Sequence, residues 1–138
     1  MNIKAIIYGA FAYTLITFPI AVIWHVVLFK EKYQVFGYFE GEPNFIIGLL
    51  TIIIQGGILS FLYPYVAFSG KGIVRGLKFS MVVGIFFWSS HVLALIAKQT
   101  MESPLVFIAM ESFYLVFQFG IYGMLIGAIY ESAAHKNA

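Results

Sequence analysis

The chain contains no cysteine and few charged residues. The missing thiols exclude disulfides, cysteine nucleophiles, zinc ribbons and iron–sulfur clusters, and they leave the redox compartment undetermined. Charged residues make up 10% of the 138 positions, whereas soluble domains usually carry about 25%. The net charge of +2 is small and scattered, so the sequence predicts no nucleic-acid partner.

Apolar residues, by contrast, make up 62% of the chain. They gather in four stretches that each reach the roughly 20 residues needed to cross a bilayer. These stretches cover residues 5–29, 45–68, 73–97 and 105–130. The first is too long for a signal-peptide core and ends in a charged segment, so we expect it to stay in the membrane. The predicted fold class is therefore all-α, a single-domain (1–138) integral membrane four-helix bundle whose first partner is the lipid bilayer.

Short connections between the stretches predict antiparallel neighbours in an up-down-up-down order. Loops rich in Lys and Arg tend to stay in the cytoplasm. One side of the predicted bundle carries Lys4, Lys71, Arg75, Lys78 and Lys136, and the other carries Lys30, Lys32 and Lys98 among several glutamates. This bias predicts cytoplasmic termini in a multi-pass protein of the cell (inner) membrane. Residues 132–138 are predicted to form a loose tail.

Arg75 and Lys78 lie in the first turns of the third stretch and can reach the interface, whereas three other ionisable residues, His25, His91 and Glu111, lie farther inside the stretches. Counting 1.5 Å per residue places all three in the outer third of the membrane, on three different helices. A charged side chain inside a bilayer is costly, so such residues usually face the bundle interior and pair with one another. The sequence therefore predicts that they meet near the outer surface.

Other polar side chains recur at helical spacing on the same faces. They predict a polar pocket along the bundle axis, because polar groups facing lipid would remain unpaired. Its expected members are Thr14, Thr51, Gln55, Ser80, Ser90, Gln118 and Tyr122. A shift of 66 residues also aligns His25 with His91 and Thr14 with Ser80, a faint internal repeat that would relate two helical hairpins.

Several further features concern shape. Pro19 is expected to kink the first helix. G-x-x-x-G pairs at Gly72 and Gly76 and at Gly123 and Gly127 permit close helix contact, either within the chain or in a homo-oligomer or larger membrane complex. Aromatic rings are expected to settle at the outer membrane boundary, namely Trp24, Trp88, Tyr33, Tyr38, Phe36 and Phe39.

The polar residues support three functional interpretations. In the first, the histidines hydrogen-bond across helices, in an accessory subunit or a ligand-binding bundle. In the second, His25 and His91 bind a haem axially or, with Glu111, a transition metal such as Zn, Cu or Fe, although no H-E-x-x-H spacing is present. In the third, the same groups exchange protons in a small proton-coupled transporter. No nucleophile–base pairing stands out, so an enzyme is not favoured and no catalytic residue is assigned.

The segment WHVVLFK, residues 24–30, resembles small uncharacterised bacterial membrane proteins whose first helix ends in Trp-Tyr, a short gap and Phe-Gly. Those proteins are similar in length and also have four predicted helices. Here His25 stands in place of the tyrosine and Lys30 in place of the glycine. The resemblance implies a bacterial four-helix protein and no known activity.

Overall fold

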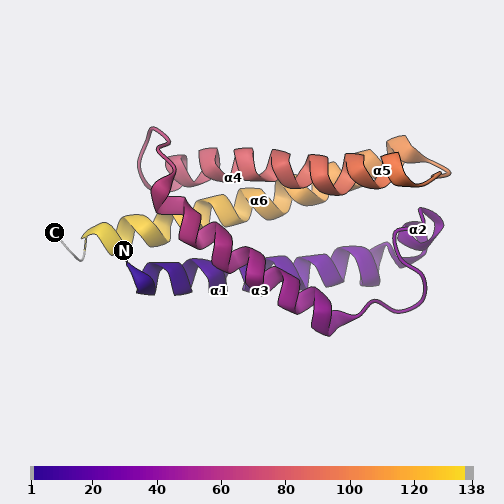
Figure 1. The fold of residues 1–138 in the computed structure, drawn as a ribbon, viewed down its shortest axis with the longest axis horizontal. Coiled ribbons are helices and arrows are strands. Elements are labelled where there is room, and N and C mark those ends of the chain that lie inside the picture. Colours follow the sequence, from indigo (N-terminus) through magenta and orange to yellow (C-terminus); the bar gives the residue numbers. More distant parts are fainter. Residues whose placement is uncertain (1, 136–138) are drawn as a thin grey trace.

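The computed structural model describes residues 2–135, and every regular element in that range is a helix. Figure 1 shows the long helices lying lengthwise in the molecule, with the two ends of the chain on the same side. In chain order the elements are α1 (Ile3–Ala21), η1 (Val22–Leu28), α2 (Lys30–Val35), α3 (Phe45–Leu62), η2 (Tyr63–Tyr65), α4 (Gly72–Trp88), η3 (Ser89–Leu93), α5 (Ala94–Lys98) and α6 (Pro104–His135).

Four helical segments are long and apolar enough to cross a membrane: Ile3–Leu28, Phe45–Tyr65, Gly72–Lys98 and Pro104–His135. Each overlaps one of the four stretches predicted from the sequence. The described residues thus form an all-helical fold with four candidate spans, which indicates a multi-pass membrane protein. Asparagine side chains cap the first two spans, since Asn2 accepts from the Ala5 amide and Asn44 from the Ile47 amide.

The structure corrects two sequence-based expectations. The last helix continues to His135, so residues 132–135 are helical rather than loose; Lys136 and the two residues after it lie outside the described range. The connection after the first span also contains a short helix, α2. This helix was not predicted because its six residues are too few for a clear hydrophobic period.

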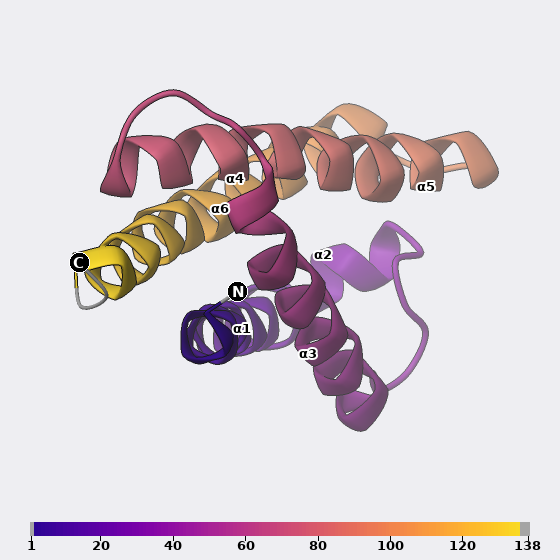
Figure 2. The same cartoon turned by 60° about the vertical axis from the view of Figure 1, so that its left-hand side comes forward.

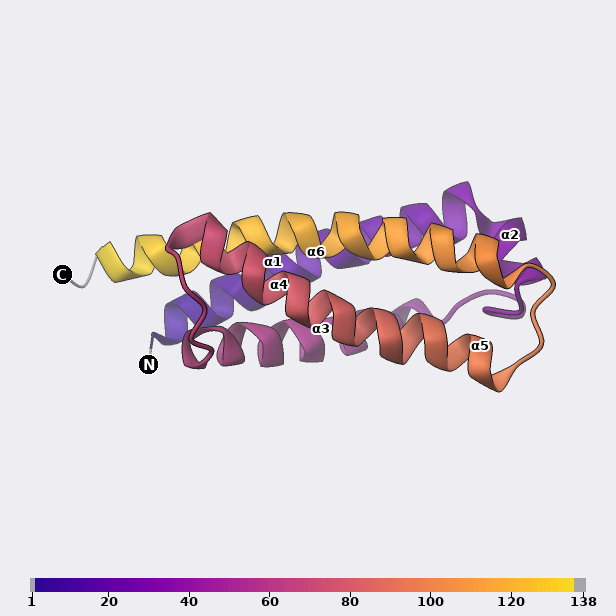
Figure 3. The same ribbon diagram turned by 90° about the horizontal axis from the view of Figure 1, so that it is seen from above.

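The helices form two hairpins that meet along one line. α1 packs against α3, α4 packs against α6, and α1 also packs against α6. α3 and α4 scarcely touch, and Figure 2 shows them diverging. Seen from above in Figure 3, α2 and the loops around it lie at the end opposite the termini. The molecule is thus closed along α1 and α6, whereas α3 and α4 separate.

Glycines set the contact between α4 and α6. A Cβ atom on Gly76 would lie 2.0 Å from the Gly123 carbonyl oxygen, and one on Gly127 would lie 2.3 Å from the Gly72 carbonyl oxygen. No side chain fits there without moving a backbone. The two G-x-x-x-G segments therefore pack against each other within the chain, a close approach that only small residues permit.

Candidate functional site

The Glu111 carboxylate lies at the meeting point of the two hairpins and is completely buried. Its Oε1 atom is 2.9 Å from His25 Nε2, and its Oε2 atom is 3.1 Å from His91 Nε2. One carboxylate therefore joins a histidine of each hairpin. The structure brings together the three ionisable residues that the sequence singled out.

Both histidines lie where the backbone leaves the α-helical pattern. His25 is in η1 and His91 in η3, and both segments are π-helical. η1 begins three residues after Pro19, which lies inside α1. Single π-helical turns are rare and often mark functional sites, because they widen the helix and re-aim its side chains. Here each of them carries an imidazole that reaches Glu111.

The contacts of His25 define where its hydrogens lie. Its Nδ1 atom is 3.0 Å from the Ala21 carbonyl oxygen, which can only accept, so Nδ1 carries a hydrogen. The contact between Nε2 and the carboxylate then holds one further proton. That proton lies either on His25, which gives an ion pair, or on Glu111, which gives a neutral pair. His25 and Glu111 thus share a single proton in a buried site.

Tyr33 of α2 folds back into the bundle and supports the ionised form of the carboxylate. Its hydroxyl accepts from Trp24 Nε1 at 2.7 Å and donates to Glu111 Oε1. The pKa of Tyr33 is raised, first by burial and then by the negative charge of Glu111, so this hydroxyl keeps its hydrogen at neutral pH. Glu111 therefore has three hydrogen-bonding partners, which compensate for its burial.

Tyr38 completes the cluster on the cavity side. Its hydroxyl lies 3.0 Å from His91 Nε2, and its ring stacks on the His25 ring with centroids 5.3 Å apart and planes inclined by 12°. Burial, followed by the charge of Glu111, raises its pKa. Gly37, with a φ of 71°, makes the turn that returns Tyr38 to the bundle, and Gln99 Nε2 donates to the carbonyls on either side of that turn.

A cavity of about 390 Å³ adjoins this cluster. It is lined mainly by α1 with η1, the first connection and α3, and it is bounded on the other side by α6, Phe87 of α4 and His91 of η3. His25, His91 and Tyr38 form its polar end. The His91 side chain is 37% exposed, whereas that of His25 is 9% exposed and that of Glu111 is fully buried. A molecule in the cavity would therefore meet the two histidines and Tyr38, with the buried carboxylate behind them.

Two glutamines and a tyrosine line the deeper part of the cavity. Gln118 Nε2 donates to the Tyr13 hydroxyl at 3.2 Å, and this hydroxyl donates to Gln55 Oε1 at 3.2 Å. These two hydrogen bonds link α6 to α1 and α1 to α3. Gln55, Gln118 and Thr51 are thus the predicted pocket residues that reach the cavity.

The other predicted pocket residues lie elsewhere. Thr14 Oγ1 donates to the Ala10 carbonyl of its own helix, and Ser90, exposed to the outside, donates to the Phe86 carbonyl. Ser80 and Tyr122 are buried between helices, and within residues 2–135 their hydroxyls have no hydrogen-bond partner. Helical spacing correctly placed Ser80 and Tyr122 on buried faces. It could not predict the π-helical shifts or the hydrogen bond that Thr14 makes within its own helix.

The geometry gives no support to coordination of a metal or a haem. Among the described residues, no group of three or more His, Cys, Asp or Glu side chains is arranged to hold a metal ion. Axial haem ligation by His25 and His91 needs two free Nε2 atoms, yet each faces an oxygen of Glu111. These contacts describe a hydrogen-bonded cluster.

Sequence reasoning assigned Tyr33 and Tyr38 to the membrane boundary and missed their place in the cluster. The signal was in the first connection, where Tyr33 and Phe36 share one face of a short helix and both are buried. Such spacing in a connecting segment indicates a helix that packs back onto the protein.

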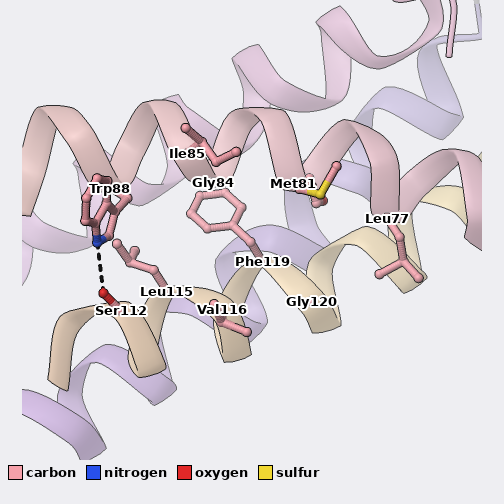
Figure 4. A pocket seen from close by; sticks show the side chains of 11 residues that line it. Leu77, Met81, Gly84, Ile85, Trp88, Ser112, Leu115, Val116, Phe119 and Gly120 are labelled. Atoms are coloured by element: carbon pink, nitrogen blue, oxygen red, sulfur yellow. Dashed lines mark hydrogen bonds between the residues drawn. The ribbon is translucent and has the colours of Figure 1, made fainter. Parts of the chain in front are cut away.

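A second cavity, of about 500 Å³, lies between α4 and α6 and is almost entirely apolar. Figure 4 shows the Phe119 ring beneath Gly84 and the hydrogen bond from Trp88 Nε1 to Ser112 Oγ, 2.9 Å long, at one end. No ionisable side chain lines it. It therefore differs in chemistry from the cavity beside the Glu111 cluster, although Leu115 lines both.

No family model, curated protein or solved structure matches this chain. The resemblance carried by residues 24–30 remains a sequence-based expectation. Function is therefore inferred from the geometry of the Glu111 cluster and the cavity beside it.

Proposed function

We propose that the protein is a ligand-binding bundle of the cell (inner) membrane, with a membrane-soluble ligand in the cavity between the two hairpins. One observation carries the proposal: the cavity of about 390 Å³ ends on His25, His91 and Tyr38. Ligand sites are typically concave and mostly apolar, with a few convergent polar groups. The separation of α3 from α4 gives such a ligand a path from the hydrocarbon.

A pair of glycines on α3 offers a direct test. Gly48 lines the cavity, Gly57 does not, and a Cβ on either would meet no atom within 4 Å. Gly48→Phe should therefore fill the cavity, while Gly57→Phe adds the same ring elsewhere on the same helix. We expect mass spectrometry of gently purified protein to find a co-purifying small molecule in the wild type and Gly57→Phe, and at least tenfold less in Gly48→Phe. Equal amounts in all three would contradict the proposal.

The proposal includes an up-down-up-down path across the membrane with both termini in the cytoplasm. It is supported by the distribution of basic residues and by the two ends lying on one side in Figure 1. Ala67 and Glu40 are exposed in the second and first connections, and cysteine at either is unique in this chain. An impermeant thiol reagent should label Glu40→Cys in intact cells and Ala67→Cys only after lysis. The reverse pattern would invert the orientation.

A second candidate, proton-coupled transport, is favoured by the proton that His25 shares with Glu111. In proteoliposomes containing a pH-sensitive dye, addition of the co-purified molecule should then drive a proton flux that Glu111→Gln abolishes. Binding without flux would leave the ligand-binding role alone. A homo-oligomer or an accessory-subunit role in a larger complex remains a prediction, which native mass spectrometry tests.

A further inference from the structure

The cavity lining bears on the charge of its ligand. It contains no Lys, Arg, Asp or Glu, and the oxygens of the nearby Glu111 are already engaged. A phosphate, carboxylate or ammonium group would therefore enter without a permanently charged partner, at a large desolvation cost. An uncharged ligand fits this lining.

Three polar residues that line the cavity, His91, Gln55 and Gln118, each have one nitrogen or oxygen atom that could bond to a ligand. His91 Nδ1 makes no hydrogen bond to any residue in the range 2–135. The same holds for Gln55 Nε2, a donor, and Gln118 Oε1, an acceptor. Such a lining matches a head group that carries oxygens and can accept or donate hydrogen bonds.

Flat rings form much of the wall. Tyr13, Tyr38, Phe39, Phe87 and Tyr114 all line the cavity. Aromatic faces and edges favour a planar ring through offset or edge-to-face packing. The apolar space between the diverging helices α3 and α4 (Figure 2) suits a hydrocarbon tail.

We infer that the ligand is a neutral quinone or quinol with an apolar tail, whose ring lies among the aromatic side chains with one oxygen beside His91 and Tyr38. The inference rests on the proposed function and names its ligand class. It concerns binding alone and involves no electron transfer. A quinone carbonyl accepts hydrogen bonds and a quinol hydroxyl also donates them, which matches the mixture of free groups.

The two tryptophans allow a sensitive test, because quinones quench indole fluorescence. Trp24 donates a hydrogen bond to Tyr33 of the cluster, whereas Trp88 lines the apolar cavity between α4 and α6. Trp88→Phe therefore leaves one reporter near the site. Titration of this variant with decyl-benzoquinone in detergent should give saturable quenching. Addition of Gly48→Phe should weaken the apparent affinity at least tenfold, and addition of Gly57→Phe should leave it within twofold.

Calorimetric titration with decanol, which has an apolar tail but no ring, distinguishes the proposed ligand-binding function from the proposed quinone class. We expect no saturable heat from decanol at concentrations where the quinone saturates. If decanol binds, Gly48→Phe blocks that binding, and the quinone does not bind, then the quinone class is wrong and the ligand-binding function stands. Quinone quenching that ignores Gly48→Phe would also overturn the inference. If neither compound binds and purified protein carries no small molecule, both proposals fail.

Discussion

The two hairpins are built on one plan but hold their histidines differently. Each has a π-helical segment with a histidine that reaches the same carboxylate. In the first hairpin, both ring nitrogens of His25 are engaged and the side chain is nearly buried. In the second, His91 uses one nitrogen for protein contacts and borders the cavity. His25 therefore holds Glu111 across the two hairpins, and His91 is the more exposed histidine beside the cavity.

The contact between helices also differs between the hairpins. In the second, α4 and α6 meet backbone to backbone at Gly76 and Gly127. In the first, a Cβ on Gly56 would lie 2.9 Å from the Ala10 carbonyl oxygen, and one on Gly9 would meet the end of the Ser60 side chain. The closest backbone approach is thus in the second hairpin, which also carries the more exposed histidine.

The largest expected effect is the loss of the residue that joins the hairpins. Glu111→Leu removes the shared partner of His25, His91 and Tyr33 and leaves the nearly buried Nε2 atom of His25 without a partner. Removing one partner of a buried pair typically costs about 3–5 kcal/mol. Unfolding of purified protein in mixed detergent should show a loss of that size. Phe117→Leu on the same helix, whose side chain is exposed, should cost less than about 0.5 kcal/mol.

Alanine at Gly76, a packed glycine of the second hairpin, should come next, with the open Gly57 of the first hairpin as its control. A methyl group on Gly76 would overlap the Gly123 carbonyl, so α4 and α6 must separate, at about 3 kcal/mol by analogy with overpacked cores. Gly57→Ala meets nothing within 4 Å and should be neutral or stabilising by up to about 1 kcal/mol. Thermal unfolding followed by helical circular dichroism checks both. A mild Gly76→Ala would mean that the glycine contact is looser than described.

Much of this arrangement could be predicted from the sequence, because apolar length and polar spacing are local signals. The four spans and the convergence of His25, His91 and Glu111 follow from counting residues along helices. The positions of Tyr33 and Tyr38 could not be predicted in this way, because they depend on how a connecting segment folds back. Nor could the sequence reveal which of two similar histidines is buried, because that depends on packing between the hairpins.

The smallest of these effects should be the difference between the two histidines. Gln in place of His25 must leave one of two buried contacts unmade, at about 1–3 kcal/mol. Gln in place of His91, which is partly exposed, should cost about 1 kcal/mol or less but should weaken ligand binding more. Unfolding and the quinone titration, run on both variants, measure the two effects. Equal losses in stability would remove the distinction between an anchoring and an accessible histidine.

The central claim is that Glu111 couples to one histidine of each hairpin. Double-mutant cycles of Glu111→Gln with His25→Gln and with His91→Gln test it most directly, with Glu111→Gln and Gln55→Leu as a pair that shares no contact. The arrangement predicts coupling of about 0.5–3 kcal/mol in both histidine cycles, larger for His25, and additivity within about 0.5 kcal/mol in the control. Additivity in either histidine cycle would contradict the claim, because the carboxylate would then serve one hairpin alone.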